Sequence, residues 1–131
     1  MNNKNEAIMN INSSEILKKL EEAGIDVADL TARLMGNMNL ITKFVKRFPD
    51  DKSYQQLMTA IDNADEEEAF RAAHSLKGVC ANLSMTRLYK LLSEQVEALR
   101  AGDLERGEVL MPAITEEYGK MVEAIRSIKW V

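Results

Sequence analysis

The sequence predicts an all-α protein, specifically an antiparallel four-helix bundle with additional short N-terminal helices. Three observations lead to this fold class. Apolar residues recur at the three- and four-residue spacing of helices that bury one face. The 131 residues include only 6 glycines and 2 prolines, and alternating runs of β-branched and aromatic residues are missing. Four long periodic stretches joined by short connections are typical of an antiparallel bundle.

Three apolar stripes carry the helical periodicity, each with polar residues on the opposite side. The C-terminal stripe consists of Ile114, Tyr118, Met121, Ile125 and Ile128. The second consists of Leu88, Leu91, Leu92, Gln95, Val96 and Leu99. The third consists of Ile41, Phe44, Val45 and Phe48, continued after Pro49 by Tyr54, Leu57, Met58 and Ile61.

Start and stop signals divide the chain into the expected helices. Pro49 and Pro112 should each kink a helix or mark its first turn. We expect a leading helix near 14–23, a short helix near 27–35, and longer helices over 37–63 (kinked at Pro49), 65–83, 85–101 and 104–129.

Polar residues and one glycine mark the ends of these helices. Asp65 is followed by Glu68 at the spacing of a capping box. Gly102 is a C-terminal stop, and Asp103 can cap the next helix. Ser84 stands where it can cap a helix that starts at Met85. Ser13 or Ser14 can cap the leading helix in the same way.

Composition indicates one folded domain with a real hydrophobic core. The chain is 46% hydrophobic and 29% charged, and 131 residues suit a single domain. We expect an N-terminal extension with a short helix over 1–23 and a helical bundle over 24–131.

Charge and cysteine content exclude several classes of function. Seventeen lysines and arginines against 21 aspartates and glutamates give a net charge of −4, which argues against a nucleic-acid partner. No apolar run approaches the ~20 residues that cross a bilayer, and the N-terminus lacks the apolar region of a signal peptide. Cys80 and His74 alone cannot complete a four-ligand zinc site. We expect a cytoplasmic protein without a membrane segment or structural metal.

The single histidine lies in the segment AAHSLKGVCANLS, residues 72–84. At about 100° per residue, the apolar side of helix 65–83 falls on one arc and His74 lies nearly opposite its centre. That apolar arc consists of Ala69, Ala72, Leu76, Val79, Cys80 and Leu83. The neighbours of His74 on the outer face, by helix geometry, are Phe70, Arg71, Lys77, Gly78 and Ala81.

Each of these neighbours has a functional and a purely structural interpretation. A glycine inside a helix costs about 1 kcal/mol relative to alanine, so Gly78 requires a reason. It either lets another protein approach the imidazole, together with the small Ala81, or packs against a neighbouring helix. Phe70 is either part of a docking patch or a flank residue covered by the adjacent helix. Lys77 and Arg71 either bind a negative group or are solvated surface residues.

The segment around HSLKG resembles the histidine-containing phosphotransfer (HPt) domain of bacterial multistep phosphorelays. The similarity runs from GIDVADLTARLMGN through FVKRFPDD and AIDNADEEEAFRAAHSLKG to LSEQVEALRAGD, nearly the whole chain. The His-x-x-Lys-Gly core of the family is intact as His74, Lys77 and Gly78. One departure is Ser84, because the family usually has glycine at that position.

This resemblance implies a phosphorelay intermediate in two-component signal transduction. His74 would accept a phosphoryl group from a receiver-domain aspartate and pass it to another receiver. Lys77, together with Arg71, would stabilise the phosphoryl charge. Phe70, Arg71, Gly78 and Ala81 would form the docking surface, and Gly78 would keep the helix surface low so that the receiver can close over His74.

The partners and cofactors follow from the same resemblance. We expect receiver domains of response regulators or hybrid sensor histidine kinases as partners, and a monomeric phosphoprotein. The protein would need no cofactor of its own, because the aspartate and the Mg²⁺ belong to the receiver. It would be a phosphohistidine carrier, not an enzyme with an ATP or metal site.

Two other functions stay open at the level of sequence. A helical adaptor that binds receivers without being phosphorylated is favoured by Ser84 and opposed by the intact motif. A di-iron bundle enzyme needs Glu-x-x-His steps from two helices, whereas Arg71 stands three residues before His74 and no second histidine exists. An ATP-dependent kinase is disfavoured, since no glycine-rich phosphate loop occurs.

Cys80 lies on the core side and is expected to be an inert buried thiol.

Overall fold

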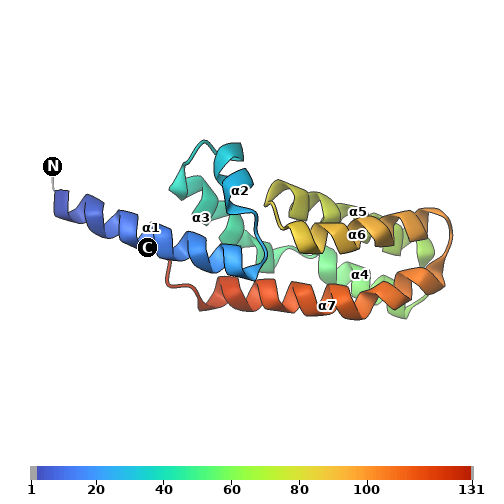
Figure 1. Ribbon diagram of the computed structural model, residues 1–131. Helices are drawn as coiled ribbons and strands as arrows, with labels where there is room; N and C mark the ends of the chain where they lie inside the picture. Colours follow the sequence, from blue (N-terminus) through green and yellow to red (C-terminus); the bar gives the residue numbers. More distant parts are fainter. Residues whose placement is uncertain (1–2, 131) are drawn as a thin grey trace.

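The computed structural model describes residues 3–130, with side chains from residue 13 onward (Figure 1). No strand occurs among these residues, and one isolated backbone bridge pairs Ile25 with Met85. The all-α, four-helix-bundle class predicted from the sequence is confirmed. The elements are α1 (Asn3–Ala23), α2 (Val27–Arg33), α3 (Met38–Arg47), the 3₁₀ turn η1 (Phe48–Asp50), α4 (Ser53–Asp62), α5 (Glu66–Asn82), α6 (Thr86–Arg100) and α7 (Leu104–Ser127).

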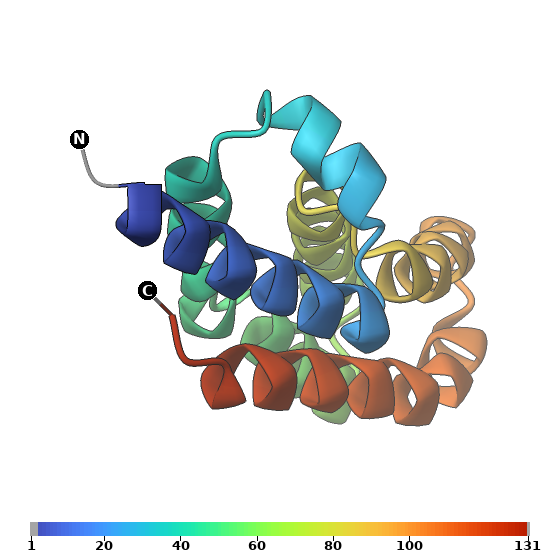
Figure 2. The same cartoon turned by 60° about the vertical axis from the view of Figure 1, so that its left-hand side comes forward.

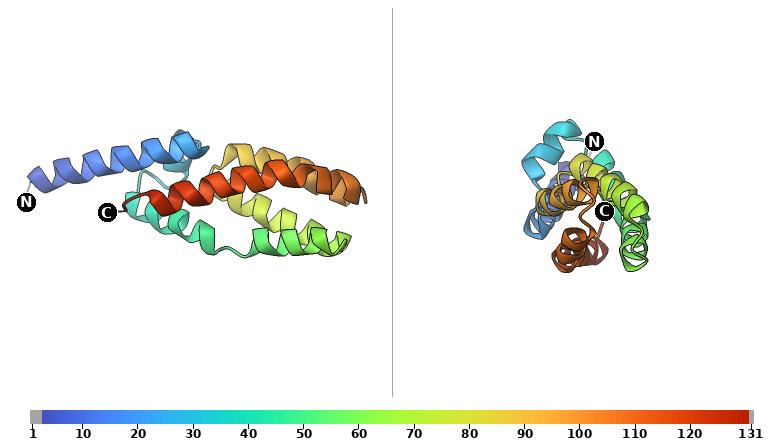
Figure 3. Two further views of the ribbon diagram at one scale, coloured as in Figure 1. Left: turned by 90° about the horizontal axis from the view of Figure 1, so that it is seen from below. Right: turned by 90° about the vertical axis from the view of Figure 1, so that its right-hand side faces the viewer.

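The bundle is formed by α4, α5, α6 and α7 (Figures 1 and 3). Helix α5 packs against both α4 and α6, and α6 packs in turn against α7. Each helix turns its apolar stripe inward, as the periodicity predicts. The side chains buried completely in this core include Leu57, Leu76, Leu92, Val96 and Ile114.

Helices α1, α2 and α3 gather at one end of the bundle (Figure 2). Helix α1 packs along α7, and its Ile16 and Leu20 are buried in the same apolar cluster as the bundle core. Helix α2 contributes Leu30 to that cluster, and α3 contributes Ile41 and Val45. A division of the chain at residue 24 stays a prediction.

The leading helix is longer than the sequence analysis predicts. It begins at Asn3 instead of near residue 14, so Ser13 and Ser14 lie within α1 and do not cap it. The physical reason is that a serine permits a helix start but does not impose one. Neither glycine nor proline occurs between residues 3 and 13 to interrupt the helix.

Pro49 breaks the predicted 37–63 helix and does not merely kink it. A proline ring clashes with the carbonyl four residues earlier and has no N–H to donate. Accordingly α3 ends at Arg47, the turn η1 follows, and α4 begins at Ser53. The Asp51 Oδ1 accepts the Ser53 N–H at 2.9 Å and so satisfies a donor of the new helix. Pro112, by contrast, lies inside α7 and does not mark a first turn.

Five helix ends share one hydrogen-bond pattern. After α1, α2, α4, α5 and α6, one residue takes a positive φ and the next N–H donates to a carbonyl five residues earlier, at 2.8–3.1 Å. This is the Schellman motif, in which glycine avoids the steric cost of left-handed backbone. A residue with a Cβ pays about 1 kcal/mol there. The five positions are Gly24, Met35, Ala64, Ser84 and Gly102.

Two of the predicted caps are confirmed. Asp65 accepts a hydrogen bond from the Glu68 N–H at 3.1 Å at the start of α5. Gly102 ends α6, and Asp103 then caps α7 by accepting the Arg106 N–H at 3.0 Å. The connections from α4 to α5 and from α6 to α7 are therefore fixed locally by side chains next to the turns.

The predicted cap by Ser84 is wrong. Helix α6 begins at Thr86 with Met85 as its N-cap residue, and no side chain caps it. Ser84 instead occupies the left-handed position of the turn, with φ +55°. A residue in that conformation belongs to the end of the preceding helix, and here it stands before the N-cap residue Met85. The Ser84 hydroxyl donates to Asp29 of α2 instead, at 2.6 Å.

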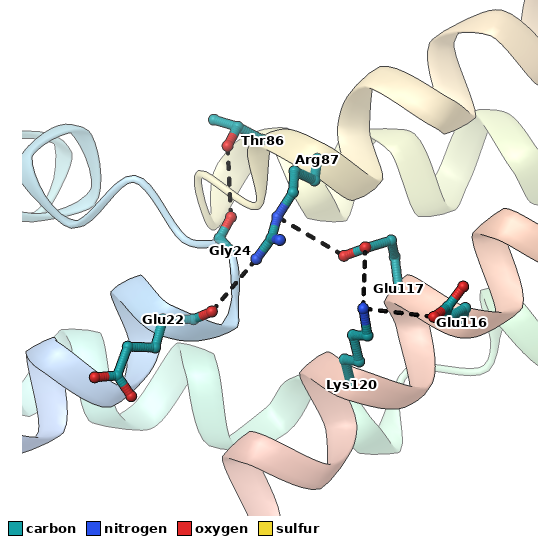
Figure 4. A network of polar contacts seen from close by, with 7 residues as sticks. All are labelled: Glu22, Gly24, Thr86, Arg87, Glu116, Glu117 and Lys120. Atoms are coloured by element: carbon teal, nitrogen blue, oxygen red, sulfur yellow. Dashed lines mark hydrogen bonds and ion pairs between the residues drawn. The ribbon is translucent and has the colours of Figure 1, made fainter.

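A polar network holds the end of α1 against α6 and α7 (Figure 4). The Arg87 Nη2 donates to the Glu22 carbonyl at 3.4 Å, and Arg87 Nε lies 3.8 Å from Glu117 Oε2. Lys120 Nζ lies 3.8 Å from the other oxygen of Glu117. The chain segment that leads from α1 into α2 is thereby kept on the bundle.

Close packing of α6 on α7 at Gly107 should make a larger residue at this position destabilising. A Cβ there would lie 2.9 Å from Leu99 Cδ2, whereas a Cβ at Gly119 of the same helix would meet no atom within 4 Å. We predict that Gly107→Val lowers the free energy of unfolding by about 1–3 kcal/mol, the usual cost of overpacking. Gly119→Val should be nearly neutral in the same urea titration. An equal loss for both variants would contradict the packing derived for α6 and α7.

Candidate functional site

Helix α5 has one buried face and one outer face, and His74 lies on the outer face. The imidazole is exposed, as predicted. Ala73 is completely buried, although it falls outside the predicted arc, so the inward face is wider than expected. The residues of α5 that are buried are Ala69, Ala72, Ala73, Leu76 and Cys80.

The ring of Phe70 flanks the imidazole. The ring centroids of Phe70 and His74 are 6.0 Å apart, with 30° between the planes. On α6, the Arg100 guanidinium carbon lies 5.5 Å from the Phe70 centroid, in the range of a cation–π contact. Phe70 is half-buried and packs against the core cluster. Its ring therefore borders the surface around His74 from one side while it covers the junction of α5 and α6.

Lys77 lies on the same outer face, one turn after His74. Its side chain is half-buried, and Nζ lies 5.7 Å from the centroid of the Tyr89 ring on α6. A cation over an aromatic face is attracted by the ring quadrupole. Tyr89 thus keeps the ammonium group at the surface shared by α5 and α6 and limits the directions in which it can move.

Arg71 is engaged by carboxylates of its own helix. Its Nη2 lies 2.7 Å from Glu67 Oε1, and its Nη1 lies 3.5 Å from Glu68 Oε2. These partners precede Arg71 by four and three residues, toward the start of α5. Its guanidinium is therefore directed away from Lys77, and its charge is already partly neutralised.

Gly78 and Ala81 keep the outer face of α5 low. Gly78 is exposed, and a Cβ built on it would meet no atom within 4 Å. The alternative interpretation, close packing of Gly78 against a neighbouring helix, is therefore wrong. Ala81 is half-buried, two turns beyond His74.

A groove lies beside the outer face of α5, toward the end of the helix. It has a volume of about 440 Å³ and lies between α2, α3 and α5. Asn82, one of its lining residues, is eight positions after His74 and so about 80° around the helix, at the border between the outer face and the apolar arc. Figure 2 shows α2 and α3 next to the end of α5. The groove is lined by Arg33, Leu34, Phe44, Arg47, Val79, Asn82 and Leu83.

Phe44 is the clearest residue that the sequence analysis placed wrongly. Its place on the apolar stripe predicts burial, but 38% of its surface is exposed, and 36% of Leu40 one turn before it. Helix α3 carries more apolar residues than one buried face can hold, since Ile41, Val45 and Phe48 already fill the core side. That excess width of the stripe was the signal for a second apolar surface. The sequence pattern gave no comparable signal for the other residues near the site that it missed, which are Arg33, Arg47 and Tyr89.

The described residues show no metal cluster and no membrane span. No group of three or more His, Cys, Asp or Glu side chains within them is arranged to hold a metal ion. None of the helices between residues 3 and 130 combines the length and apolarity that a bilayer-crossing helix needs.

The comparison with protein families decides the class of this bundle. A family model described as Hpt domain matches residues 39–127, which include His74, Lys77, Gly78 and all four bundle helices. The chain belongs to the Hpt domain family. No curated protein and no solved structure matches it.

Membership establishes the general role of this Hpt domain. Proteins of the family act in histidine phosphotransfer within phosphorelays and interact with receiver domains, as carriers more than as catalysts. The family match also agrees with the sequence resemblance stated above. It spans the bundle and α3, and it begins after α1 and α2.

Burial makes the one thiol of the chain unreactive. Cys80 is completely buried on the core side of α5, as expected, and desolvation raises the pKa of its thiol from 9.0 to about 12. The thiolate is the reactive form, so we predict no reaction of the folded protein with a disulfide reagent at pH 8. The thiol should react within seconds once denaturant unfolds the chain. Rapid reaction without denaturant would contradict the packing of α5.

Proposed function

We propose that this Hpt domain accepts a phosphoryl group on His74 from a receiver-domain aspartate and passes it to another receiver. The observation that carries the proposal is the exposed imidazole on α5 with the bare backbone of Gly78 one turn away. An active site on another protein has to reach this nitrogen, and the surface offers no side chain that blocks its approach from that direction.

The transfer needs little chemistry from the Hpt domain itself. A ring nitrogen of unprotonated His74 attacks phosphorus, a P–N bond forms, and the P–O bond to the aspartate breaks. The aspartate leaves as a carboxylate, and the imidazole releases its extra proton to water. Phosphoryl transfer depends mainly on positioning and charge neutralisation. An exposed imidazole is a sufficient nucleophile for this step without an adjacent base.

Lys77 is assigned to the charge of the phosphoryl group. It stands three residues after His74 on the same face, and Tyr89 keeps its ammonium near α6. A charge-assisted hydrogen bond from this ammonium would stabilise the phosphorylated state. Arg71 is the weaker candidate for this role, because Glu67 and Glu68 already bind its guanidinium.

The receiver is proposed to dock along α5 from Phe70 to the groove. Phe70, Gly78 and Ala81 form the part next to His74. Beyond them, exposed Phe44 supplies apolar area and Arg47 supplies positive charge. The charge of Arg33 is partly balanced by Asp29, 2.8 Å from its Nε, so Arg33 contributes mainly its other N–H donors. A receiver that holds Mg²⁺ must present carboxylates around its aspartate, so Arg47 beside the path of approach complements its charge.

The remaining requirements are assigned to the partner. Mg²⁺ would be bound by the receiver, and the Hpt domain would act without a nucleotide, a metal or another cofactor of its own. We expect it to work as a monomer in the cytoplasm, with response regulators or hybrid sensor histidine kinases as partners. The identity of those partners determines the direction of phosphate flow.

Phosphate acceptance by His74 is tested by transfer from a receiver. Purified protein is incubated with a radiolabelled, phosphorylated receiver domain and Mg²⁺. We predict a label that is lost in acid, survives base and is absent in His74→Gln, with unchanged helical circular dichroism. Retained label in His74→Gln would refute His74 as the acceptor. Binding of receivers without any label in the wild-type protein would favour the adaptor function instead.

The role of Gly78 as a contact surface is tested by a matched pair of glycines. Gly78 and Gly119 both lie in helices and both face open space. Glutamine at either site raises helix propensity and should change stability by less than about 1 kcal/mol. We predict that Gly78→Gln weakens receiver binding roughly tenfold, a cost of about 1.4 kcal/mol, whereas Gly119→Gln leaves it unchanged in isothermal titration calorimetry. Equal affinities of the two variants would remove Gly78 from the docking surface.

A further inference from the structure

Ser84 connects the α5–α6 turn to α2 through its side chain. The residue is buried, has φ +55°, and donates from Oγ to Asp29 Oδ2 at 2.6 Å across 55 positions of sequence. Glycine fits this backbone conformation without strain, and a hydroxyl side chain does not. The serine therefore brings one strained residue and one long-range hydrogen bond to the turn.

Asp29 extends this contact to the groove. The same oxygen that accepts from Ser84 lies 2.8 Å from Arg33 Nε, one turn later in α2. Arg33 in turn lines the groove between α2, α3 and α5. It also borders a second hollow of about 250 Å³, in which Asp29, Ser84 and Ala81 take part. Ser84, Asp29 and Arg33 thus form a continuous chain from the turn to the groove wall.

Backbone contacts bring α2 to the same turn but do not orient its far side. The Asp26 N–H donates to the Ser84 carbonyl at 2.8 Å, and Ile25 bridges to Met85. These contacts fix the start of α2, where Asp26 also caps the helix. The hydrogen bond from Ser84 reaches Asp29, one turn further, and adds to the burial of Leu30 in restraining the rotation of the helix about its own axis.

We propose that Ser84 is a positioning residue that holds α2 and the Arg33 side chain at the wall of the groove. The consequence for partner recognition rests on the proposed function, because the groove is taken as part of the receiver-docking surface. Through its bond to Asp29, the Ser84 hydroxyl holds Arg33 in one orientation, and a glycine at position 84 could not form this bond. Ser84 thereby contributes to which receivers dock without touching them.

The electrostatics of Asp29 agree with this arrangement. The hydrogen bond from Ser84 is the largest influence on the carboxyl group, and together with the bond from Arg33 it keeps the pKa of Asp29 below its ordinary value of 3.8. The carboxylate is therefore charged at neutral pH. Its Oδ2 atom accepts both hydrogen bonds, from Ser84 and from Arg33.

The turn between α4 and α5 provides a matched control. Ala64 has φ +54° in the same hydrogen-bond pattern, and its side chain has no polar group. Ala64→Gly and Ser84→Gly relieve the same backbone strain, but only Ser84→Gly removes a hydrogen bond to α2. Any difference between the two variants therefore isolates the side chain of Ser84 from the conformation of the turn.

The first test is made on the free protein by amide hydrogen exchange and by the NMR signal of the Arg33 Nε–H. We expect Ser84→Gly to accelerate exchange in α2 and at Arg33 Nε by about tenfold, the effect of losing one charge-assisted hydrogen bond. Ala64→Gly should leave both unchanged. Asp29→Ala removes the bond from Ser84 and also the acceptor of Arg33 Nε, so it should accelerate exchange at Arg33 Nε at least as much as Ser84→Gly. Adding Ser84→Gly to Asp29→Ala should change little further, because the bond between Ser84 and Asp29 is already lost. Unchanged exchange at Arg33 Nε in Ser84→Gly would overturn the proposal.

The second test measures receiver affinity with the same variants. We expect Ser84→Gly to weaken binding about threefold to tenfold, with Ala64→Gly equal to wild type. A looser Arg33 with unchanged affinity, while label transfer to His74 persists, would overturn the role of Ser84 in docking and leave the proposed function intact. If the wild-type protein neither binds receivers nor takes label, the proposed function fails, and the exchange data still decide whether Ser84 positions Arg33.

Discussion

The close packing of α5 between α4 and α6 is the constraint on which the rest of the structure depends. The inward face of α5 is built from small residues, Ala69, Ala72 and Ala73, followed by Leu76 and Cys80, all buried. Small side chains let neighbouring helices approach closely, and dispersion then acts over many contacts. Because α5 is fixed on this side, its opposite strip must face outward. The imidazole can therefore stand in water on a rigid helix, and its position is set by a core it does not touch.

The turns of the bundle show how local strain is distributed around that core. Five helix ends use one backbone geometry, and two of them have glycine at the left-handed position. Two residues with a Cβ adopt the unfavourable left-handed conformation on either side of α5, Ala64 just before it and Ser84 just after it. At Ser84 the hydrogen bond to Asp29 compensates for it, and the same bond ties α2 to the bundle. Ser84 lies 10 residues after His74 in the chain. Through Asp29, its side chain also affects the position of Arg33 at the groove.

The sequence was sufficient for α5, α6 and α7 and for the strip around His74, because both follow from short-range periodicity. It predicted one kinked helix over 37–63, where Pro49 instead separates α3 from α4. Asp65, Gly102 and Asp103 act within their own turns, so their positions also could be predicted. The start of α1 could not, since serine permits a helix start without enforcing one. The exposure of Phe44 and the contact between Ser84 and Asp29 depend on how separate elements meet. Only the arrangement of α2, α3 and α5 in space determines those contacts.

The central claim is that this one imidazole, on the outer face of α5, carries the phosphoryl group. The chain has a single histidine, so its ring nitrogens give one set of signals in a ¹⁵N NMR spectrum. The most direct measurement follows these signals while a phosphorylated receiver and Mg²⁺ are added to ¹⁵N-labelled protein. The account predicts that one ring nitrogen acquires a coupling to ³¹P and that the Gly78 amide shifts with it. Imidazole signals that stay unchanged while the receiver loses its phosphate would contradict the account.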